Sequence, residues 1–137
     1  MIIVYLRGGI GNQLFQYAAG RRLAHKWNTE LKIDTTYFDA IKLRPYSLGL
    51  FNISATIATP EEIARVKTAN GIKQEESRFM PEVLDYPDNV WLYGYWAHEK
   101  YFADISDLLH KELTLRNPIS ATAANWKKKI LAERHFI

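Results

Sequence analysis

The pattern of apolar and polar residues predicts an alternation of strands and helices that starts at the N-terminus. Ile2–Leu6 is an unbroken apolar run, which is typical of a strand buried on both faces of a parallel sheet. Apolar residues then recur at helical spacing over Leu14–Trp27, and Glu30–Asp34 alternates like a second strand. These segments predict a βαβ unit with a right-handed crossover.

The first helix is expected to bury one stripe of residues spaced four apart. Phe15, Ala19, Leu23 and Trp27 make up that stripe. The segments beyond the βαβ unit are predicted as follows: irregular structure over 35–58, a helix that starts at the capping box Thr59–Glu62 and ends near Ala69, a loop with room for one short strand over 72–89, a strand at Val90–Trp96, and helices at Glu99–Leu113 and Thr122–Glu133.

These elements predict a single α/β domain over residues 1–137, with a Rossmann-like parallel sheet and flanking helices. A chain of 137 residues is long enough for one such domain. Its last residues, His135–Ile137, look like the start of another strand. We therefore expect the chain to be a fragment of a longer protein.

Composition narrows the classes of partner and cofactor. The net charge is +3, and the only tight basic cluster, Lys127–Lys129, is more typical of a solvated helix face than of a nucleic-acid site. There is no cysteine, and His25, His110 and His135 lack metal-ligand spacing, so no metal site is expected. No apolar run is long enough to span a membrane and Met1–Leu6 is too short for a signal peptide, which predicts a cytoplasmic protein, with peripheral attachment to the inner membrane face as an option.

The richest chemistry lies where the first strand meets the first helix. Arg7 precedes a turn that contains Gly8, Gly9 and Gly11 and ends in two amide side chains, Asn12 and Gln13. We call residues 8–13 the glycine turn. Glycines let backbone N–H groups approach a ligand, and a helix N-terminus favours negative charge.

Three interpretations of the glycine turn remain open at this point. It is an anion or sugar site, a tight connection whose glycines serve only backbone geometry, or a dinucleotide site. Gly9, Gly11 and the later Asp34 fit the dinucleotide pattern, but Leu14 occupies its third glycine position. A Walker A loop is excluded because no Gly-Lys-Ser/Thr follows.

The turn and several later segments resemble bacterial α-1,2-fucosyltransferases, glycosyltransferase family 11. The resemblance starts with the residues Gly-Gly-Ile-Gly-Asn-Gln-Leu-Phe-Gln-Tyr-Ala over 8–18 and continues, in the same order as in the family, through Leu31–Asp34, Arg44–Leu48, Phe51–Ile53, Gly94–Trp96 and Glu99–Phe102. One difference is Ala97-His98, where the family usually has Gln-Ser. The other is that the family's His-x-Arg-Arg-Gly-Asp-Tyr motif would begin only after residue 137.

The resemblance implies the N-terminal half of a two-domain GT-B enzyme, inactive by itself without its C-terminal donor-binding domain. Such an enzyme transfers fucose from GDP-fucose to the 2-hydroxyl of a galactoside, with inversion and without a metal. Its partners would be the nucleotide sugar and a galactoside glycan. Arg7 and the glycine turn would then contact the donor diphosphate from across the cleft.

Catalytic and acceptor residues are harder to identify from the sequence. His98 and Asp34 are titratable and follow strands, so they are candidate bases, although a structural role fits each of them too. Tyr95 and Trp96 are candidate acceptor contacts, whereas burial beneath helices is the alternative for the aromatic residues of this strand. A non-catalytic sugar- or phosphate-binding module and an NAD-type domain remain the alternative functions.

Overall fold

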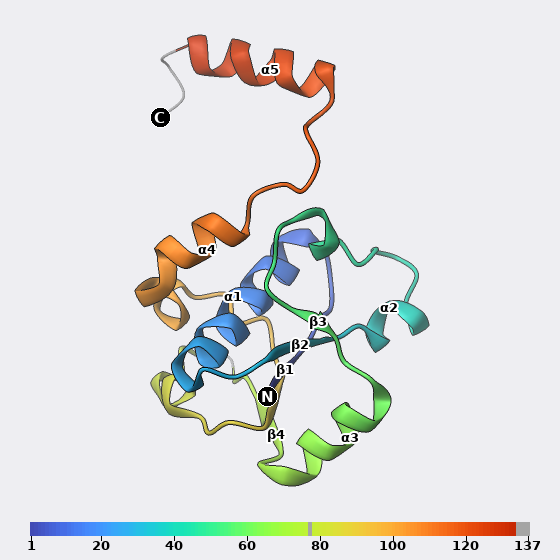
Figure 1. Cartoon of the computed structure of the whole chain (residues 1–137), viewed down its shortest axis with the longest axis vertical. Coiled ribbons are helices and arrows are strands. Elements are labelled where there is room, and N and C mark those ends of the chain that lie inside the picture. Colours follow the sequence, from blue (N-terminus) through green and yellow to red (C-terminus); the bar gives the residue numbers. More distant parts are fainter. Residues whose placement is uncertain (77, 134–137) are drawn as a thin grey trace.

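The computed structural model describes residues 1–76 and 78–133, and its centre is an all-parallel sheet of five strands in the order β3-β2-β1-β5-β4 (Figure 1). The strands are β1 (Ile2–Tyr5), β2 (Leu31–Asp34), β3 (Thr56–Ile57), β4 (Ile72–Gln74) and β5 (Val90–Tyr93). The predicted α/β class and the βαβ unit are confirmed, since β1 pairs in parallel with both β2 and β5.

The helices differ from the prediction mainly in the segments with weak patterns. They are α1 (Ile10–Trp27), α2 (Thr36–Ala40), α3 (Pro60–Ala69), α4 (Ser106–Glu112) and α5 (Ala121–Ala132). The capping box of α3 forms as expected, since Thr59 and Glu62 exchange both hydrogen bonds. The segment 35–58 was predicted to be irregular, but it contains α2 and β3.

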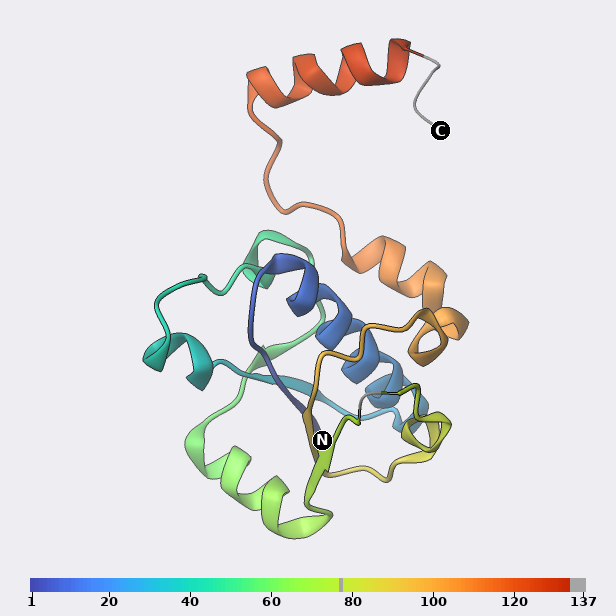
Figure 2. The same ribbon diagram turned by 180° about the vertical axis from the view of Figure 1, so that it is seen from behind.

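The predicted helix over 99–113 is wrong in its first half. Two short 3-10 turns, Glu99–Tyr101 and Ala103–Ile105, precede α4. The break lies at Phe102, whose backbone, with φ −149° and ψ 8°, is not helical. Beyond α4 the chain leads to α5, which stands apart from the sheet (Figures 1 and 2).

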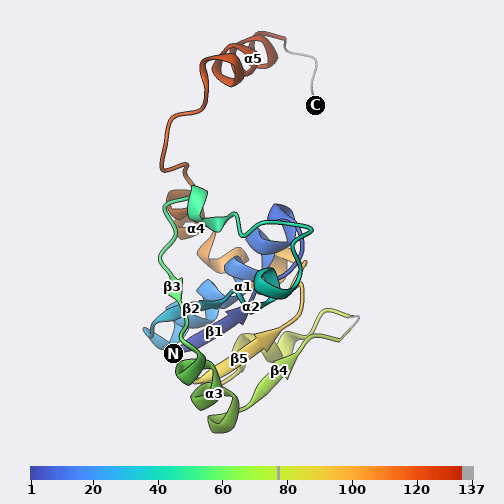
Figure 3. The same cartoon turned by 90° about the vertical axis from the view of Figure 1, so that its right-hand side faces the viewer.

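The two faces of the sheet are covered by different helices, α1 on one face and α3 on the other (Figure 3). Alternation along β1 directs Ile2, Val4 and Leu6 into the core that contains α1. Ile3 and Tyr5 point to the opposite face, where Ile3 belongs to the smaller core beneath α3 and Tyr5 packs against it. This division determines on which side of the sheet each residue after β1 emerges.

The buried face of α1 is more polar than the predicted apolar stripe. Ala19 and Leu23 are buried as expected, but Phe15 and Trp27 are 39% and 44% exposed, so the stripe is wrong at both ends. The helix instead buries Gln13, Gln16, Tyr17 and Gly20 against the sheet and the loops at its edge.

The strand order fixes where a ligand site is expected. From β1 the chain builds the sheet in one direction through β2 and β3, and then adds β4 and β5 on the other side. Ligands of parallel α/β sheets bind at the carboxyl ends of the strands where this reversal occurs. Here that point lies between β1 and β5, where Arg7 and Gly94 leave the sheet.

No helix in the described part of the chain is both long and apolar enough to cross a membrane. The last segment predicted from the sequence, a strand start at His135–Ile137, lies outside the described residues.

Candidate functional site

The glycine turn leads from β1 to a helix N-terminus that has free donors. Gly9 is the N-cap of α1, no side chain caps the helix, and its first turn contains no acidic residue. The backbone N–H groups of Ile10, Gly11 and Asn12 find no acceptor among the described residues. Free N–H groups and the dipole of an 18-residue helix together favour an anion at this place.

The three glycines of the turn have different structural requirements. Gly8 has φ +78°, and a Cβ there would lie 2.6 Å from Nδ2 of Asn12, so both conformation and space require glycine. A Cβ on Gly9 or Gly11 would meet nothing within 4 Å, and neither has a positive φ. The fold itself therefore does not need glycine at positions 9 and 11, and the space in front of them is open.

Gln13, which we expected to face a ligand, is instead fully buried and holds two loops. Its Nε2 donates to the carbonyl oxygens of Gly8 and Pro45 at 3.0 and 2.9 Å, and its Oε1 accepts from the N–H of Ser47 at 2.8 Å. With both ends of the amide bonded, its role in this structure is to position the turn.

Gln16, which the sequence analysis did not single out, has a matching role one turn along α1. Its Oε1 accepts from the N–H of Arg7 at 3.1 Å, and its Nε2 donates to the carbonyl of Gly94 at 3.0 Å. It therefore joins the carboxyl ends of β1 and β5, the two strands that flank the expected site. The signal that could have found it is an amide on the helix face that also contains Gln13.

We predict that Gln16→Leu lowers the free energy of unfolding by about 1–3 kcal/mol, because it leaves the N–H of Arg7 and the carbonyl of Gly94 without their buried partner. Urea unfolding followed by tryptophan fluorescence measures this. His25→Gln at an exposed position of the same helix is the control and should change stability by less than about 0.5 kcal/mol. Equal effects of the two substitutions would contradict the bridging role.

Arg7 extends away from α1 and lies beside two tyrosines, Tyr93 at the end of β5 and Tyr95 just after it. Its Nη1 donates to the hydroxyl of Tyr93 at 2.9 Å, and its guanidinium lies 4.6 Å from the ring centre of Tyr93 and 4.2 Å from that of Tyr95. The Nε atom of Arg7 is buried without an acceptor, and the Arg7 side chain forms no ion pair with any described carboxylate. The positive charge is thus held in place but not neutralised.

Asp34, a candidate base, is 1% exposed and fully hydrogen-bonded. Its Oδ1 accepts from the N–H and hydroxyl of Thr36 at 3.0 and 2.7 Å, and its Oδ2 accepts from Nε1 of Trp91 at 2.9 Å. This geometry supports the structural alternative, in which Asp34 holds the loop after β2. The negative charge of Asp34 also affects its neighbour Tyr5: burial, and to a smaller extent this charge, raise the pKa of the Tyr5 hydroxyl.

His98 and Tyr95 line a hollow of 310 Å³ at the carboxyl ends of β4 and β5. The Nδ1 of His98 accepts from the N–H of Lys100 at 3.2 Å, and its ring packs on Phe79. The hollow also contains Glu75, a carboxylate that sequence reasoning missed. Its Oε2 accepts from the N–H groups of Tyr95 and Trp96 at 2.6 and 2.9 Å.

The two candidate acceptor contacts lie in different environments. Tyr95 is 39% exposed beside Arg7, so its ring is available to a ligand. Trp96 is fully buried and packs edge-on against Tyr101, so the expectation that it contacts an acceptor is not supported by its position. Gly94 allows the close approach of Glu75, whose Cβ would lie 2.4 Å from a Cβ at position 94.

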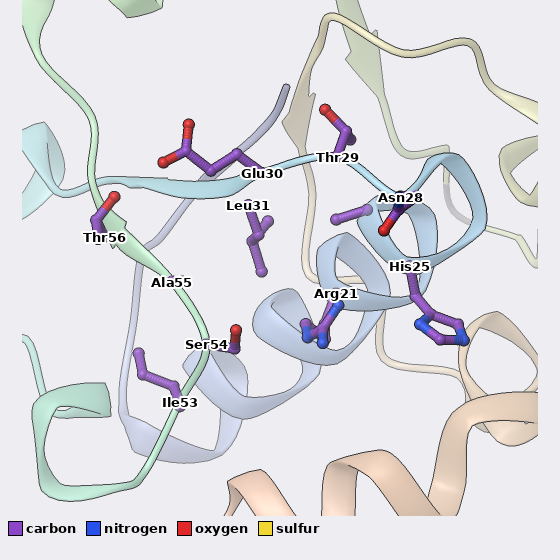
Figure 4. Close-up of a pocket in the computed structure, with 11 residues that line it drawn as sticks. Arg21, His25, Asn28, Thr29, Glu30, Leu31, Ile53, Ser54, Ala55 and Thr56 are labelled. Carbon is purple, nitrogen blue, oxygen red and sulfur yellow. The ribbon is translucent and has the colours of Figure 1, made fainter.

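A larger, polar hollow of 510 Å³ lies at the amino ends of β2 and β3, lined by residues that include Arg21, His25 and Asn28 (Figure 4). An apolar groove of 450 Å³ runs between α1 and α4. We place the site at the carboxyl edge despite these larger volumes, because the free N–H groups and the unpaired Arg7 are there. Among residues 1–76 and 78–133, no three His, Asp or Glu side chains come together as a metal site.

Comparison with known proteins finds a relative that aligns with most of this chain. An alpha-1,2-colitosyltransferase from Escherichia coli is 27% identical in an alignment 130 residues long, and the alignment covers 83% of this chain and 45% of the relative. The chain thus spans less than half of that protein's length. No family model and no solved structure matches the chain.

Proposed function

We propose that the chain is the N-terminal Rossmann-like part of an enzyme that transfers a sugar from a nucleotide sugar to a glycan hydroxyl. The observation that carries the proposal is the uncapped N-terminus of α1 behind the glycine turn, at the edge where the sheet order reverses. The similarity to a colitosyltransferase, aligned over most of this chain, supports glycosyl transfer as the reaction class.

The chemistry of glycosyl transfer explains why such a turn is useful. As the sugar leaves, negative charge builds up on the departing diphosphate, and donors fixed in advance lower the energy of that state. The N–H groups of Ile10, Gly11 and Asn12 are such donors, and the Asn12 side chain stands beside them over Gly8. We propose that this turn contacts the diphosphate and that no metal is needed.

The finer proposal is α-1,2 transfer of fucose from GDP-fucose to the 2-hydroxyl of a galactoside, with inversion. It rests on the motif resemblance over residues 8–18 and 94–102, whereas the relative's name makes activated colitose the competing donor sugar. Deprotonation of the acceptor hydroxyl requires a base, for which His98 and Glu75 in the hollow beside Tyr95 are the candidates. The remaining donor contacts would come from a C-terminal domain in a GT-B arrangement.

Gly9→Ala and Gly11→Ala test the turn without disturbing the fold. Both methyl groups have room, and alanine at either position should leave stability within about 1 kcal/mol of the parent. Each methyl would occupy the space through which a diphosphate approaches the N–H groups. We expect GDP-fucose binding by the complete protein, in which the C-terminal domain supplies the remaining donor contacts, to weaken about 10- to 100-fold in calorimetry, the loss of one or two hydrogen bonds to a charged group.

Thermal unfolding of each variant serves as the control for folding. If both alanine variants are stable and bind GDP-fucose as tightly as the parent, the turn is only a tight connection and the proposal fails. Titration with activated colitose in the same series compares the two donor sugars.

Two alternative functions make different predictions for the same experiments. A non-catalytic binding module would bind the nucleotide sugar equally well, but the complete protein would not transfer it. An NAD-type domain needs a carboxylate for the ribose hydroxyls, and Asp34 is a poor candidate for that role, because it is buried and already accepts three hydrogen bonds. Tight NAD binding would nevertheless overturn the glycosyltransferase proposal.

A further inference from the structure

Aromatic rings gather on the α3 side of the sheet and continue past the carboxyl ends of β1 and β5. Tyr5 stacks on Tyr93 with ring centres 5.6 Å apart, and Trp91 stacks on Tyr93 at 5.8 Å. Tyr37 meets Tyr5 edge-on at 6.3 Å. These rings form one connected surface drawn from both strands that flank the expected site.

Helix α3 covers only the first part of this aromatic surface. Trp91 is 6% exposed beneath α3, whereas Tyr5 and Tyr93 are half-buried and Tyr95 is 39% exposed. Exposure therefore rises along the strands toward their carboxyl ends. An aromatic face that opens in this direction can accept the apolar face of a sugar ring.

Arg7 supplies a positive charge at the open end of this surface. Its guanidinium lies against the rings of Tyr93 and Tyr95, which fix its position through cation–π contacts and one hydrogen bond. Its Nε is buried without an acceptor, and its charge has no carboxylate partner among the described residues. An arginine held in this way is prepared for an anion that the protein itself does not provide.

The arginine lies on the side of the sheet away from the helix that follows the glycine turn. Arg7 continues the alternation of Ile3 and Tyr5, which face α3, while Ile2 and Val4 face α1. The hydrogen bond from Arg7 to Tyr93 keeps the guanidinium on the α3 side. The guanidinium therefore lies on the other side of the sheet from the N-terminus of α1, where the diphosphate is expected.

We propose that Arg7, Tyr93 and Tyr95 form an acceptor subsite for an anionic sugar residue, with the ring stacked on tyrosine and its carboxylate or phosphate bound by the guanidinium. This inference rests on the proposed glycosyl transfer and specifies its acceptor class as an acidic glycan. The buried Nε is out of a ligand's reach, but Nη1 and Nη2 keep N–H donors that suit the two oxygens of a carboxylate, and phosphate offers the same geometry.

A matched pair of ligands tests the subsite on the purified 137-residue chain. Methyl β-galacturonide and methyl β-galactoside share ring stereochemistry and differ only in the carboxylate at C6. We expect the galacturonide to bind about 10- to 100-fold more tightly, the range of one charge-assisted hydrogen-bonded pair. NMR titration of the tyrosine ring signals measures both affinities, and galactose 6-phosphate in a third arm distinguishes phosphate from carboxylate.

Substitutions at Arg7 test whether its charge causes the preference for the galacturonide over the galactoside. Arg7→Met keeps much of the aliphatic stem and should bring galacturonide affinity down to that of the galactoside. Arg7→Lys should keep part of the preference, and added salt should weaken only the anionic ligands. If Arg7→Met fails to fold, the lysine variant and the salt dependence decide the question.

Three outcomes would overturn the subsite: equal binding of the two galactose derivatives, no binding of either at millimolar concentration, or an acidic preference that survives Arg7→Met. The glycine-turn variants separate this failure from failure of the proposed function. If Gly9→Ala still weakens GDP-fucose binding while the acidic preference is absent, only the acceptor inference is wrong.

Discussion

Glu112→Ala is expected to lower the free energy of unfolding by about 3–5 kcal/mol, because it leaves a mostly buried arginine without its counter-charge. Glu112, at the end of α4, accepts from Nε of Arg21 at 3.0 Å through both oxygens and also accepts from the hydroxyl of Tyr17. The Arg21 and Glu112 side chains are only 15% and 11% exposed. Urea unfolding followed by circular dichroism measures the loss.

The same network reaches the segment before β3, which makes the effect larger than that of one ion pair. The Tyr17 hydroxyl accepts from the N–H of Ser54 at 3.0 Å while it donates to Glu112. Burial and the bond to this carboxylate raise the pKa of Tyr17, so the phenol stays a donor at any ordinary pH. Losing Glu112 therefore loosens α4 and the 54–56 segment together.

The control for this prediction removes both charges. Arg21→Met combined with Glu112→Leu replaces the pair with apolar groups and should recover at least half of the lost stability. A double variant as unstable as Glu112→Ala would show that packing, rather than an uncompensated charge, is responsible.

Gly20→Ala is expected to cost about 1–3 kcal/mol, because α1 lies too close to the sheet to admit a methyl group. A Cβ at this position would lie 2.1 Å from Cγ2 of Val4 and 3.1 Å from Cδ1 of Leu31. Valine has one stiff side-chain torsion and cannot swing away, so the helix itself must shift. Thermal unfolding of the variant, with tryptophan fluorescence as the signal, gives the change.

Gly11→Ala is the matched control in the same helix, since its methyl group would meet nothing within 4 Å and alanine favours the helix. It should be neutral or stabilising. Val4→Ala combined with Gly20→Ala should be less damaging than the sum of the two single changes. If the stability losses of Val4→Ala and Gly20→Ala simply add in the double variant, the clash with Val4 is not the reason that position 20 rejects alanine.

The strongest parts of the sequence pattern predicted the centre of the fold well. Ile2–Leu6 and Val90–Trp96 each contain an observed strand, because strands buried on both faces are mostly apolar. The strand within Glu30–Asp34 was visible instead from the alternation of apolar and charged residues. β3 escaped prediction because it has only two residues, Thr56 and Ile57, both exposed, so it has no apolar pattern. Its place in the sheet depends on backbone pairing with β2 alone.

The sequence indicated where the candidate site lies but not the role of each residue in it. Strand, glycine turn and helix N-terminus were visible as a local pattern, whereas the environments of Asp34, Gln13 and Trp96 depend on residues far along the chain. Asp34, for example, is bonded to Trp91, 57 positions away. Hydrophobic periodicity also counts an amide as polar, and so it could not show that α1 buries Gln13 and Gln16.

The two buried glutamines of α1 have a consequence for which surrounding residues are free to vary. All five of their hydrogen bonds go to backbone atoms, of Gly8, Pro45 and Ser47 for Gln13, and of Arg7 and Gly94 for Gln16. Side chains on the loops around 45–47 and after β5 can therefore change without breaking the supports of the turn. New loop sequences can therefore be grafted at these two places while the glycine turn and the ends of β1 and β5 keep their positions.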